Sequence, residues 1–399
     1  MISPCPKNYT FLERIKLQSS DLKIYKFQWS NCLFYVKITK ILSVPKSVVF
    51  WTGERRARRF IMEQYPENKK NNLKVSVLLA TYNGGKYLKE QLDSIFKQDF
   101  SSFNLYVSDD GSSDDTMEIL NSYVSILPEK IHILNKRQHP ENEKPENSAC
   151  SNFLYLLKNV DSDLYFFCDQ DDVWKENHIS MMLEKYNTLA SAERNLPVLI
   201  YTDLSVVDSK LGIISTSDFD YAKRPANQHK NSYFFSTNIR GCATLINDSL
   251  KRMIFRNPEV LEKNLSKIEM HDVFATLIAS FFGKKYFIKK SSLLYRQHGS
   301  NTCGIGKKRT FCETAKKGIS FNRYKNSYKV LKNDLKKRQV YAAFFLEYFA
   351  DLLGKKEKTV LTDFVNISNK IKFARVLFLL KNQFLKYGLI NNIWLFIVV

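Results

Sequence analysis

The strongest constraint on the fold is an alternation of apolar strands and amphipathic helices between residues 73 and 306. Each apolar run of strand length is followed by a polar turn and then by a run with apolar residues at helical spacing. The runs of strand length are KVSVLLA (74–80), FNLYVS (103–108), IHIL (131–134) and DLYFFC (163–168). This alternation predicts an α/β domain with a mixed, mostly parallel central sheet.

Three of these strands end in polar, turn-forming residues. The turns are Tyr82-Asn83-Gly84, Asp109-Asp110-Gly111 and Asp169-Gln170-Asp171. In open α/β sheets, ligands bind beyond the carboxyl ends of the strands. We therefore expect the three turns to converge on one crevice.

The segment FFCDQDDVW (166–174) places three carboxylates, Asp169, Asp171 and Asp172, within four positions. A divalent cation such as Mg²⁺ or Mn²⁺ would neutralise them, because hard cations prefer oxygen ligands and share their shell with phosphate oxygens. The alternative is a polar turn with a helix cap, since a helical run that includes Ile179 follows. Taken alone, this motif favours the cap.

Two further segments carry acidic residues. Asp109 and Asp110 in SDDGSSDDT (108–116) can accept hydrogen bonds from a nucleotide base or ribose, although Asx-turn chemistry explains the segment almost as well. EMHDVFATLIASFFG (269–283) opens a helix at His271 and Asp272. Asp272 is therefore a helix cap or, if it faces a crevice, a general base.

A last strand, in LLYRQHGSN (293–301), brings Arg296 and His298 to its polar end. His298 is either a metal ligand or a surface histidine. The segment GSNTCGIGKK (299–308) does not satisfy the spacing of a P-loop, because no Gly-Lys-Ser/Thr stands at the required offset.

Six segments in this order resemble the family 2 glycosyltransferases with the glycosyltransferase A-type fold. Within that family the chain is most similar to the bacterial rhamnosyltransferase-like branch, in which DQDDVW is typical. The resemblance covers about residues 73–303 and rests on VLLATYNGG, VSDDGSSDDT, FFCDQDDVW, RGCATLIN, MHDVFATL and LLYRQHGSN.

The resemblance implies a role for each matching residue. Asp272 would be the catalytic base, although His271 stands where the family more usually has Glu. The metal ligands would be Asp169, Asp171 and His298, with Asp172 shaping the site. The residues implied in binding the nucleotide-sugar are Thr81, Tyr82, Asn83, Asp109, Asp110, Asp169, Gly241 beside the donor sugar, and Arg296 at the diphosphate.

These roles imply an inverting glycosyltransferase that depends on Mn²⁺ or Mg²⁺ and acts in cell-surface polysaccharide biosynthesis. It would move a sugar, with rhamnose as the candidate, from a nucleoside-diphosphate sugar to a glycan or lipid-linked acceptor. The alternative from another class is a catalytically inactive carbohydrate-binding or scaffold protein. A processive synthase would need membrane spans and a QxxRW motif, and the sequence shows neither. A nucleotidyltransferase would need a glycine-rich basic loop after the first strand, where this sequence has VLLATYNGG.

The charge of the chain is concentrated at its two ends. Residues 1–74 carry a net charge of +10 and residues 307–399 one of +14, whereas 75–306 carry −3. This distribution argues against a nucleic-acid groove in the central domain and fits an anionic membrane surface. We accordingly divide the chain into a basic extension (1–72), the catalytic domain (73–306) and a basic, mainly helical region (307–399).

The helical region contains an apolar stripe, Phe373, Leu377, Leu380 and Phe384, opposite lysine and arginine residues. The stripe would either contact a membrane or pack on the catalytic domain. Seven scattered cysteines without metal-ligand spacing indicate a reducing compartment. With no signal-peptide pattern and no apolar window of spanning length, we expect a cytoplasmic protein, either free or peripheral on the membrane.

Overall fold

The computed structural model describes residues 10–15, 22–29, 32–39, 73–134, 148–299 and 321–399. The chain forms two compact units, Met1–Trp51 and Thr52–Val399. In the first unit, strands β1, β2 and β3 form an antiparallel sheet in that order. These strands span Thr10–Ile15, Leu22–Trp29 and Cys32–Thr39. The rest of the basic extension, including the charged run at 54–60, lies outside the described residues.

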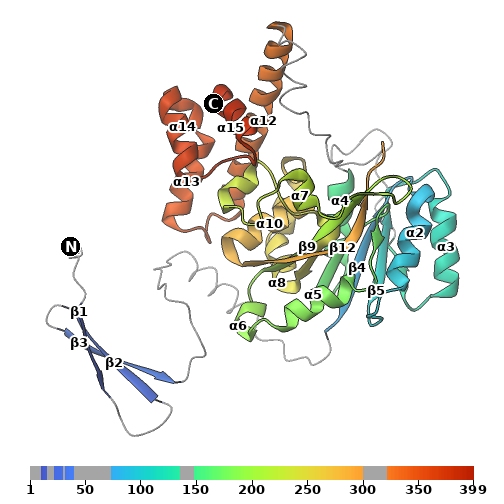
Figure 1. Cartoon of the computed structure of the whole chain (residues 1–399), viewed down its shortest axis with the longest axis horizontal. Helices are drawn as coiled ribbons and strands as arrows, with labels where there is room; N and C mark the ends of the chain where they lie inside the picture. The colour runs from blue at the N-terminus through green and yellow to red at the C-terminus, as the bar shows by residue number, and fades with distance from the viewer. Residues whose placement is uncertain (1–9, 16–21, 30–31, 40–72, 135–147, 300–320) are drawn as a thin grey trace. The chain divides into compact units, whose positions relative to one another are not determined.

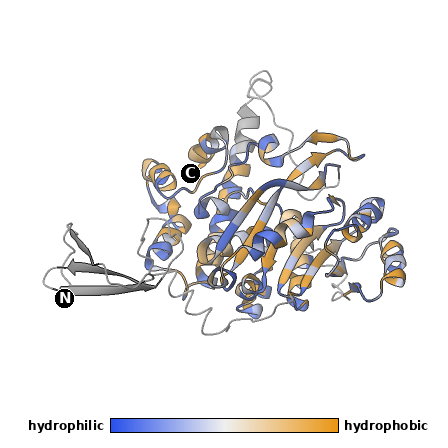
Figure 2. Cartoon of the chain, turned by 60° about the horizontal axis from the view of Figure 1, so that its bottom comes forward, coloured by the Kyte–Doolittle hydropathy of each residue, from blue (hydrophilic) through white to orange (hydrophobic). Residues whose placement is uncertain are grey.

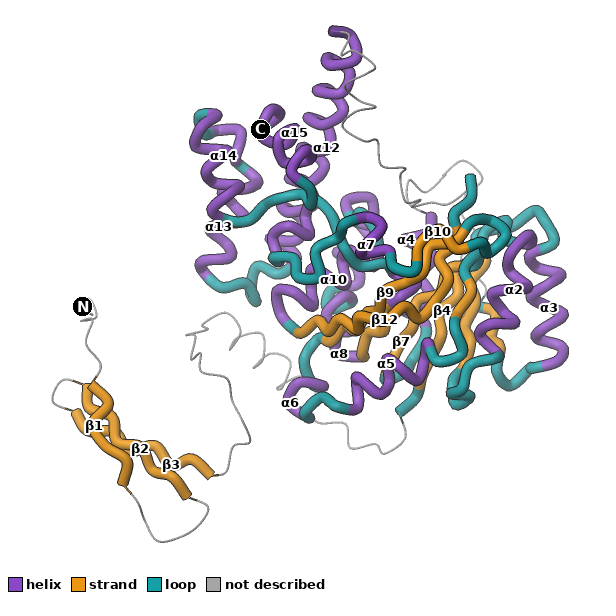
Figure 3. The backbone as a smooth tube through the Cα atoms, viewed as in Figure 1, coloured by secondary structure: helices purple, strands orange, loops and turns teal. Residues whose placement is uncertain are grey.

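The second unit is built on a sheet with the strand order β6-β5-β4-β7-β11-β9-β12-β8, and β10 pairs with β9 (Figures 1 and 3). Strands β8, β10 and β11 run antiparallel to their neighbours, and the other strands run in one direction. The prediction of a mixed, mostly parallel sheet is therefore confirmed. The strands are β4 (Val75–Thr81), β5 (Asn104–Asp109), β6 (Ile131–Ile133), β7 (Leu164–Asp169), β8 (Val173–Trp174), β9 (Val198–Val207), β10 (Ile213–Ser215), β11 (Thr244–Asn247) and β12 (Lys284–Arg296).

Helices cover both faces of this sheet, which explains why its central strands are apolar throughout. In β4, Val77 and Leu79 belong to one hydrophobic cluster and Leu78 to another. The first cluster includes residues of α2 (Gly85–Phe96), α3 (Thr116–Ile126) and α5 (His178–Asn187). The second includes residues of α4 (Ser148–Asn159), α8 (Asp248–Ile254) and α10 (His271–Phe282). Shorter helices are α6 (Ser191–Arg194), α7 (Asp218–Ala222) and α9 (Pro258–Lys263).

The carboxyl ends of β5, β4 and β7 lie side by side in the sheet. Thr81 at the end of β4 is in register with Asp109 of β5, and Ala80 is in register with Asp169 of β7. The three polar turns that follow these strands therefore begin at the same edge of the sheet, as the sequence predicted.

The described part of the C-terminal region, 321–399, contains four α-helices, which confirms the predicted helical character. They are α12 (Phe321–Tyr348), α13 (Lys355–Val365), α14 (Lys372–Lys381) and α15 (Leu389–Val398), grouped beside the sheet in Figure 1. Among the described residues, no helix is both long enough and apolar enough to cross a membrane.

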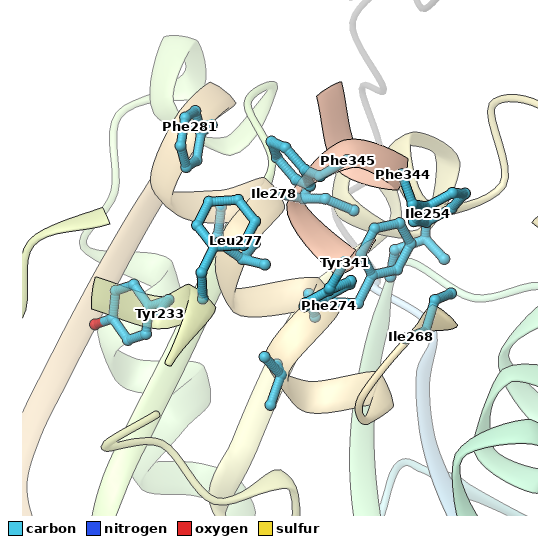
Figure 4. Packing of buried hydrophobic residues seen from close by; sticks show 14 of the residues in the cluster. Tyr233, Ile254, Ile268, Phe274, Leu277, Ile278, Phe281, Tyr341, Phe344 and Phe345 are labelled. Carbon is cyan, nitrogen blue, oxygen red and sulfur yellow. The ribbon is translucent and has the colours of Figure 1, made fainter. Parts of the chain in front are cut away.

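Aromatic side chains join the C-terminal helices to helix α10 (Figure 4). Phe345 of α12 lies 5.0 Å from Phe281, and Phe349 lies 4.9 Å from Phe282, measured between ring centroids. Both sides of this contact belong to one hydrophobic cluster. The described C-terminal helices, within 321–399, therefore share a core with the α/β domain, and their removal would expose it.

This shared core yields a prediction about stability. Phe345 is fully buried, so Phe345→Ala should lower the free energy of unfolding by about 3–5 kcal/mol, through lost burial and the cavity left behind. Val330 lies on the same helix but is 67% exposed, so Val330→Ala should change it by about 0.5 kcal/mol or less. Urea unfolding of the full chain measures both values, and equal effects would contradict a shared core.

Candidate active site

Hydrogen bonds connect the turns that follow β4, β5 and β7. The backbone N–H of Tyr82 donates to Gln170 Oε1 at 2.8 Å, and Gln170 Nε2 donates to the Tyr82 carbonyl at 2.9 Å. The N–H of Asn83 donates to Ser112 Oγ at 2.8 Å. A Cβ at position 84 would lie 2.2 Å from Gln170 Oε1, so only glycine permits this approach. The three turns therefore form one connected edge.

The carboxylate of Asp109 organises its own turn. It accepts hydrogen bonds from the Thr81 hydroxyl at 2.8 Å and from the backbone N–H groups of Gly111 at 3.0 Å and Ser112 at 2.7 Å. These contacts fit the Asx-turn interpretation of the segment. Thr81 is buried below the turn, whereas Tyr82 and Asn83 are exposed beside it. The implied contacts of these residues with a nucleotide stay predictions.

The carboxylate cluster is not a helix cap, so the cap interpretation of DQDD was wrong. Helix α5 has Asn177 as its N-cap, and strand β8 separates that residue from Asp171 and Asp172. Asp172 is fully buried, and its Oδ1 accepts a hydrogen bond from the backbone N–H of Arg296 at 3.0 Å. Its Oδ2 is buried without a hydrogen-bond partner among the described residues.

A cysteine thiol lies against the acidic residues. Carboxylate oxygens of Asp169 and Asp172 and the Sγ of Cys242 lie within 4.8 Å of one another. Burial, followed by the charges of Asp172 and Asp169, raises the pKa of the Cys242 thiol well above its usual range. The thiol therefore stays protonated and lies beside the carboxylates as a neutral, weakly polar group, not as a thiolate ligand.

Burial and mutual repulsion disfavour ionisation of these acids. Burial, followed by the charges of Asp171 and Asp272, raises the pKa of Asp169 to about 7. Burial and the charge of Asp171 raise the pKa of Asp172 well above its usual range. A cation would relieve this repulsion, and the free oxygen of Asp172 with the oxygen-rich donor set fits a hard divalent ion.

Asp171 and His298, 127 residues apart in the chain, are in contact as the metal prediction requires. His298 Nε2 lies 2.7 Å from Asp171 Oδ2, and the imidazole lies 4.9 Å from the Tyr87 ring, between centroids. Asp169 neighbours Asp171 closely enough for their charges to interact. Their joint role as metal ligands stays a prediction.

Arg296 holds the turn that contains Asp169 and Asp171, which we call the acidic turn, in place. Its side chain is 1% exposed, its Nε donates to the Asp171 carbonyl at 2.7 Å, and its guanidinium lies 4.4 Å from the Tyr87 ring centroid. It also contacts the carboxylate of Glu90. These contacts indicate a positioning role, and its implied diphosphate contact stays a prediction. The sequence pattern of α2 does not distinguish Tyr87 and Glu90 from ordinary helix positions.

Asp272 lies in the first turn of α10, where two backbone groups fix its carboxylate. Oδ2 accepts a hydrogen bond from the N–H of Gly241 at 2.9 Å, and Oδ1 accepts one from the N–H of Val273 at 2.7 Å. Burial raises the pKa of Asp272, while these N–H groups oppose that shift. Gly241 is thus tied directly to the candidate base, and Asp272 is near enough to Asp169 to affect its ionisation.

His271 is a neutral packing residue beside the candidate base. Its ring lies 4.0 Å from that of Phe153 and 4.7 Å from that of Phe167, between centroids. Both ring nitrogens are buried without a hydrogen-bond partner in the described part of the chain, and burial lowers the pKa to about 3. A Cβ at position 241 would lie 2.9 Å from His271 Nε2, so the imidazole requires a glycine there.

Arg240 is a site residue that our sequence analysis missed. Its Nε lies 3.6 Å from the buried carboxylate of Asp218, which also pairs with Arg224 at 2.8 Å. The charge of Arg240 lowers the pKa of both Asp169 and Asp272, so a fixed cation acts on the acidic turn and on the candidate base. Its position directly before Gly241 in RGCATLIN was the available signal.

The burial of His271 predicts a pH dependence of stability. The unfolded chain binds a proton at this residue below about pH 6.5, whereas the folded chain keeps it neutral down to about 3. Stability should therefore fall as pH decreases from 6.5, by up to about 1.4 kcal/mol per pH unit for this residue. Urea unfolding between pH 6.5 and 5 should give a smaller slope for His271→Gln, and a slope identical to that of the parent chain would contradict the assignment.

Comparison with known proteins identifies relatives over the same part of the chain. The family model of glycosyl transferase family 2 matches residues 76–192. The dTDP-rhamnosyl transferase RfbG of Shigella flexneri is 28% identical over 235 residues, which is 57% of this chain and 73% of RfbG. The poly(ribitol-phosphate) β-N-acetylglucosaminyltransferase TarS of Staphylococcus aureus is 36% identical over 102 residues, 25% of this chain and 16% of TarS.

For two further relatives, the match covers slightly less than two thirds of the relative's own length. It covers 63% and 66% of two uncharacterized glycosyltransferases, from Rickettsia typhi and Rickettsia prowazekii. Among solved structures, that of S. aureus TarS residues 1–349 aligns with 79% of this chain and 93% of its own, at 14% identity and a TM-score of 0.42.

The matched region 76–192 holds nearly all of β4, strands β5 and β7, and the three polar turns that follow them. The sheet, the order of the six motifs and the named relatives agree on one assignment. Residues 76–192 therefore match glycosyl transferase family 2, and they contribute strands to a mixed, mostly parallel α/β sheet.

Proposed function

We propose that this protein is a metal-dependent, inverting glycosyltransferase of cell-surface polysaccharide biosynthesis. It transfers a sugar from a nucleoside-diphosphate sugar to a hydroxyl of a glycan or lipid-linked saccharide. The observation that carries the proposal is the gathering of acidic residues beyond β7. His298 contacts Asp171, Cys242 lies beside the carboxylate of Asp169, and the adjoining Gly241 donates a hydrogen bond to Asp272.

The donor would lie along the connected turns. Tyr82, Asn83, Asp109 and Asp110 stand at the edge where the base and ribose would bind. Asp169, Asp171 and His298 would hold Mn²⁺ or Mg²⁺, which supplies positive charge to the diphosphate as it departs. Arg240 adds a fixed positive charge beside the same acids, held by Asp218. Arg296 keeps the acidic turn in place through the Asp171 carbonyl.

Asp272 would act on the acceptor. Its carboxylate takes the proton from the acceptor hydroxyl while that oxygen forms a bond to the anomeric carbon of the donor sugar. The bond from the anomeric carbon to the phosphate oxygen breaks, and the nucleoside diphosphate leaves with the electron pair. A single displacement from the opposite face inverts the anomeric configuration. The hydrogen bonds from Gly241 and Val273 orient the carboxylate, and burial makes it a stronger base.

The relatives suggest which donors to test first. RfbG is named a dTDP-rhamnosyl transferase, so dTDP-rhamnose is our first candidate. TarS is named an N-acetylglucosaminyltransferase, which makes UDP-N-acetylglucosamine the second. The test is a thermal-shift screen of UDP-, dTDP- and GDP-sugars with Mn²⁺ or Mg²⁺. We expect the sugars of one nucleotide class to raise the melting temperature of the protein. The bound donor is the species whose shift disappears when the metal is chelated.

We also propose a cytoplasmic location, peripheral on the cytoplasmic face of the membrane, where a lipid-linked acceptor would be available. The excess of basic residues in 307–399 supports an anionic surface as the partner. Residues 75–306 carry a net charge of −3, so the central domain lacks the excess of positive charge that binding to nucleic acid requires.

The assignment of Asp272 gives a direct test. Asp272→Asn keeps the shape of the side chain but removes the base, so the rate of transfer should fall by about 10²–10⁴. Donor affinity should stay within about threefold, because the proton transfer contributes to the reaction and not to donor binding. Release of nucleoside diphosphate, with and without acceptor, measures the rate, and calorimetry measures the affinity.

The matched control is Glu259→Gln, which replaces an exposed carboxylate on α9 by an amide. It should leave the transfer rate and the donor affinity unchanged. Undiminished turnover by Asp272→Asn would refute the base. A parent chain that binds nucleotide-sugar without releasing diphosphate would favour the inactive carbohydrate-binding alternative.

A further inference from the structure

Helix α14 exposes large apolar side chains on one face. Phe373 is 71% exposed, Leu377 49% and Leu380 46%, and Ile371 directly before the helix is 75% exposed. The spacing i, i+4, i+7 of the three helix residues places them on one stripe. We call Ile371, Phe373, Leu377 and Leu380 the α14 face. Large apolar side chains exposed together in this way mark a site of interaction.

The rest of the helix is anchored to the body of the second unit. Leu379 on its inner side is fully buried, and Phe384 just after the helix stacks on Phe364 of α13, with ring centroids 4.2 Å apart. Arg375 donates to the carbonyl of Val399 at 2.7 Å. The apolar stripe seen in the sequence is therefore divided, because Phe384 packs internally while the α14 face points outward.

Exposed lysines lie at both ends of the α14 face. Residues 364–399 contain five lysine and arginine residues and no aspartate or glutamate. Lys372 and Lys381, at the two ends of α14, are both exposed, and Lys370 pairs with Asp363 at 3.3 Å. In Figure 2, hydrophobic and hydrophilic segments adjoin on the helices around the C-terminus. A partner for this surface must accept apolar side chains and cations together.

We infer that the α14 face docks onto an anionic lipid surface. Its apolar side chains would enter the head-group region, and Lys372 and Lys381 would contact the acidic lipids, as basic amphipathic helices do. The helix spans Lys372–Lys381 and carries a narrow apolar stripe, so it would lie in the plane of the interface and not cross the bilayer. An acidic protein partner would match the lysines but would not require so many exposed apolar side chains.

This inference specifies the membrane contact proposed above, but it rests on the surface of α14 and not on the transfer reaction. Removing 307–399 is a poor test, because it would also expose the aromatic core shared with α10. Point substitutions on the α14 face leave that core intact, since every residue changed is already exposed.

The test is co-sedimentation of the full chain with phosphatidylcholine vesicles, with and without phosphatidylglycerol, at low and high salt. We expect binding to the anionic vesicles that weakens with salt. The double variant Phe373→Glu/Leu377→Glu should bind at least about tenfold more weakly. It loses two apolar side chains that would enter the head-group region, and its two new carboxylates would repel the anionic lipids. The matched control is Ile213→Glu/Ile214→Glu on β10, where the two residues are 61% and 47% exposed, and it should bind like the parent chain.

Three outcomes would overturn the inference. They are no binding of the parent chain to anionic vesicles, equal binding by the α14 variant, or a parent chain that forms a dimer which the α14 variant dissolves without any vesicle binding. The thermal shift with nucleotide-sugar should be the same for both variants and the parent chain. Loss of that shift in all of them would instead indicate failure of the proposed enzymatic function.

Discussion

The structure depends on the gathering of like charges at the end of β7. Burial and repulsion make three carboxylates costly there, and burial with its acidic neighbours raises the pKa of Asp169 to about 7. The protein offsets part of this cost with groups from distant parts of the chain: the thiol of Cys242, the backbone N–H of Arg296 and the charge of Arg240. The remaining repulsion favours a cation and an anionic ligand that binds with it.

The placement of the candidate base depends on the C-terminal helices. Asp272 opens α10, and the rings of Phe281 and Phe282 on that helix pack against α12. Burial of Tyr341 on α12 raises the pKa of its phenol, and the charges of Cys150 and Asp272 act in the same direction. The described part of the C-terminal region, 321–399, thus packs against the helix that carries the candidate base, while one of its outer faces carries the α14 side chains.

Much of this arrangement is predictable from the sequence, because apolar periodicity and turn residues determine it locally. The strands, the convergence of their turns, the start of α10 at His271 and the contact of Asp171 with His298 follow from that pattern and the family resemblance. Arg240, Glu90 and Asp218 do not, since their roles depend on how loops and helix surfaces meet. Phe373 and Phe384 belong to one stripe in the sequence, and only tertiary packing separates the exposed residue from the buried one.

The central claim is that distant acidic residues meet around one divalent ion and a sugar nucleotide. The most direct measurement is a crystal structure of the protein with Mn²⁺ and a nucleoside-diphosphate sugar, in which anomalous scattering locates the metal. Our account predicts a manganese peak in contact with Asp171 and His298 and with the diphosphate, with Asp272 facing the anomeric carbon. A donor bound away from these residues, or a manganese peak that none of them contacts, would contradict it.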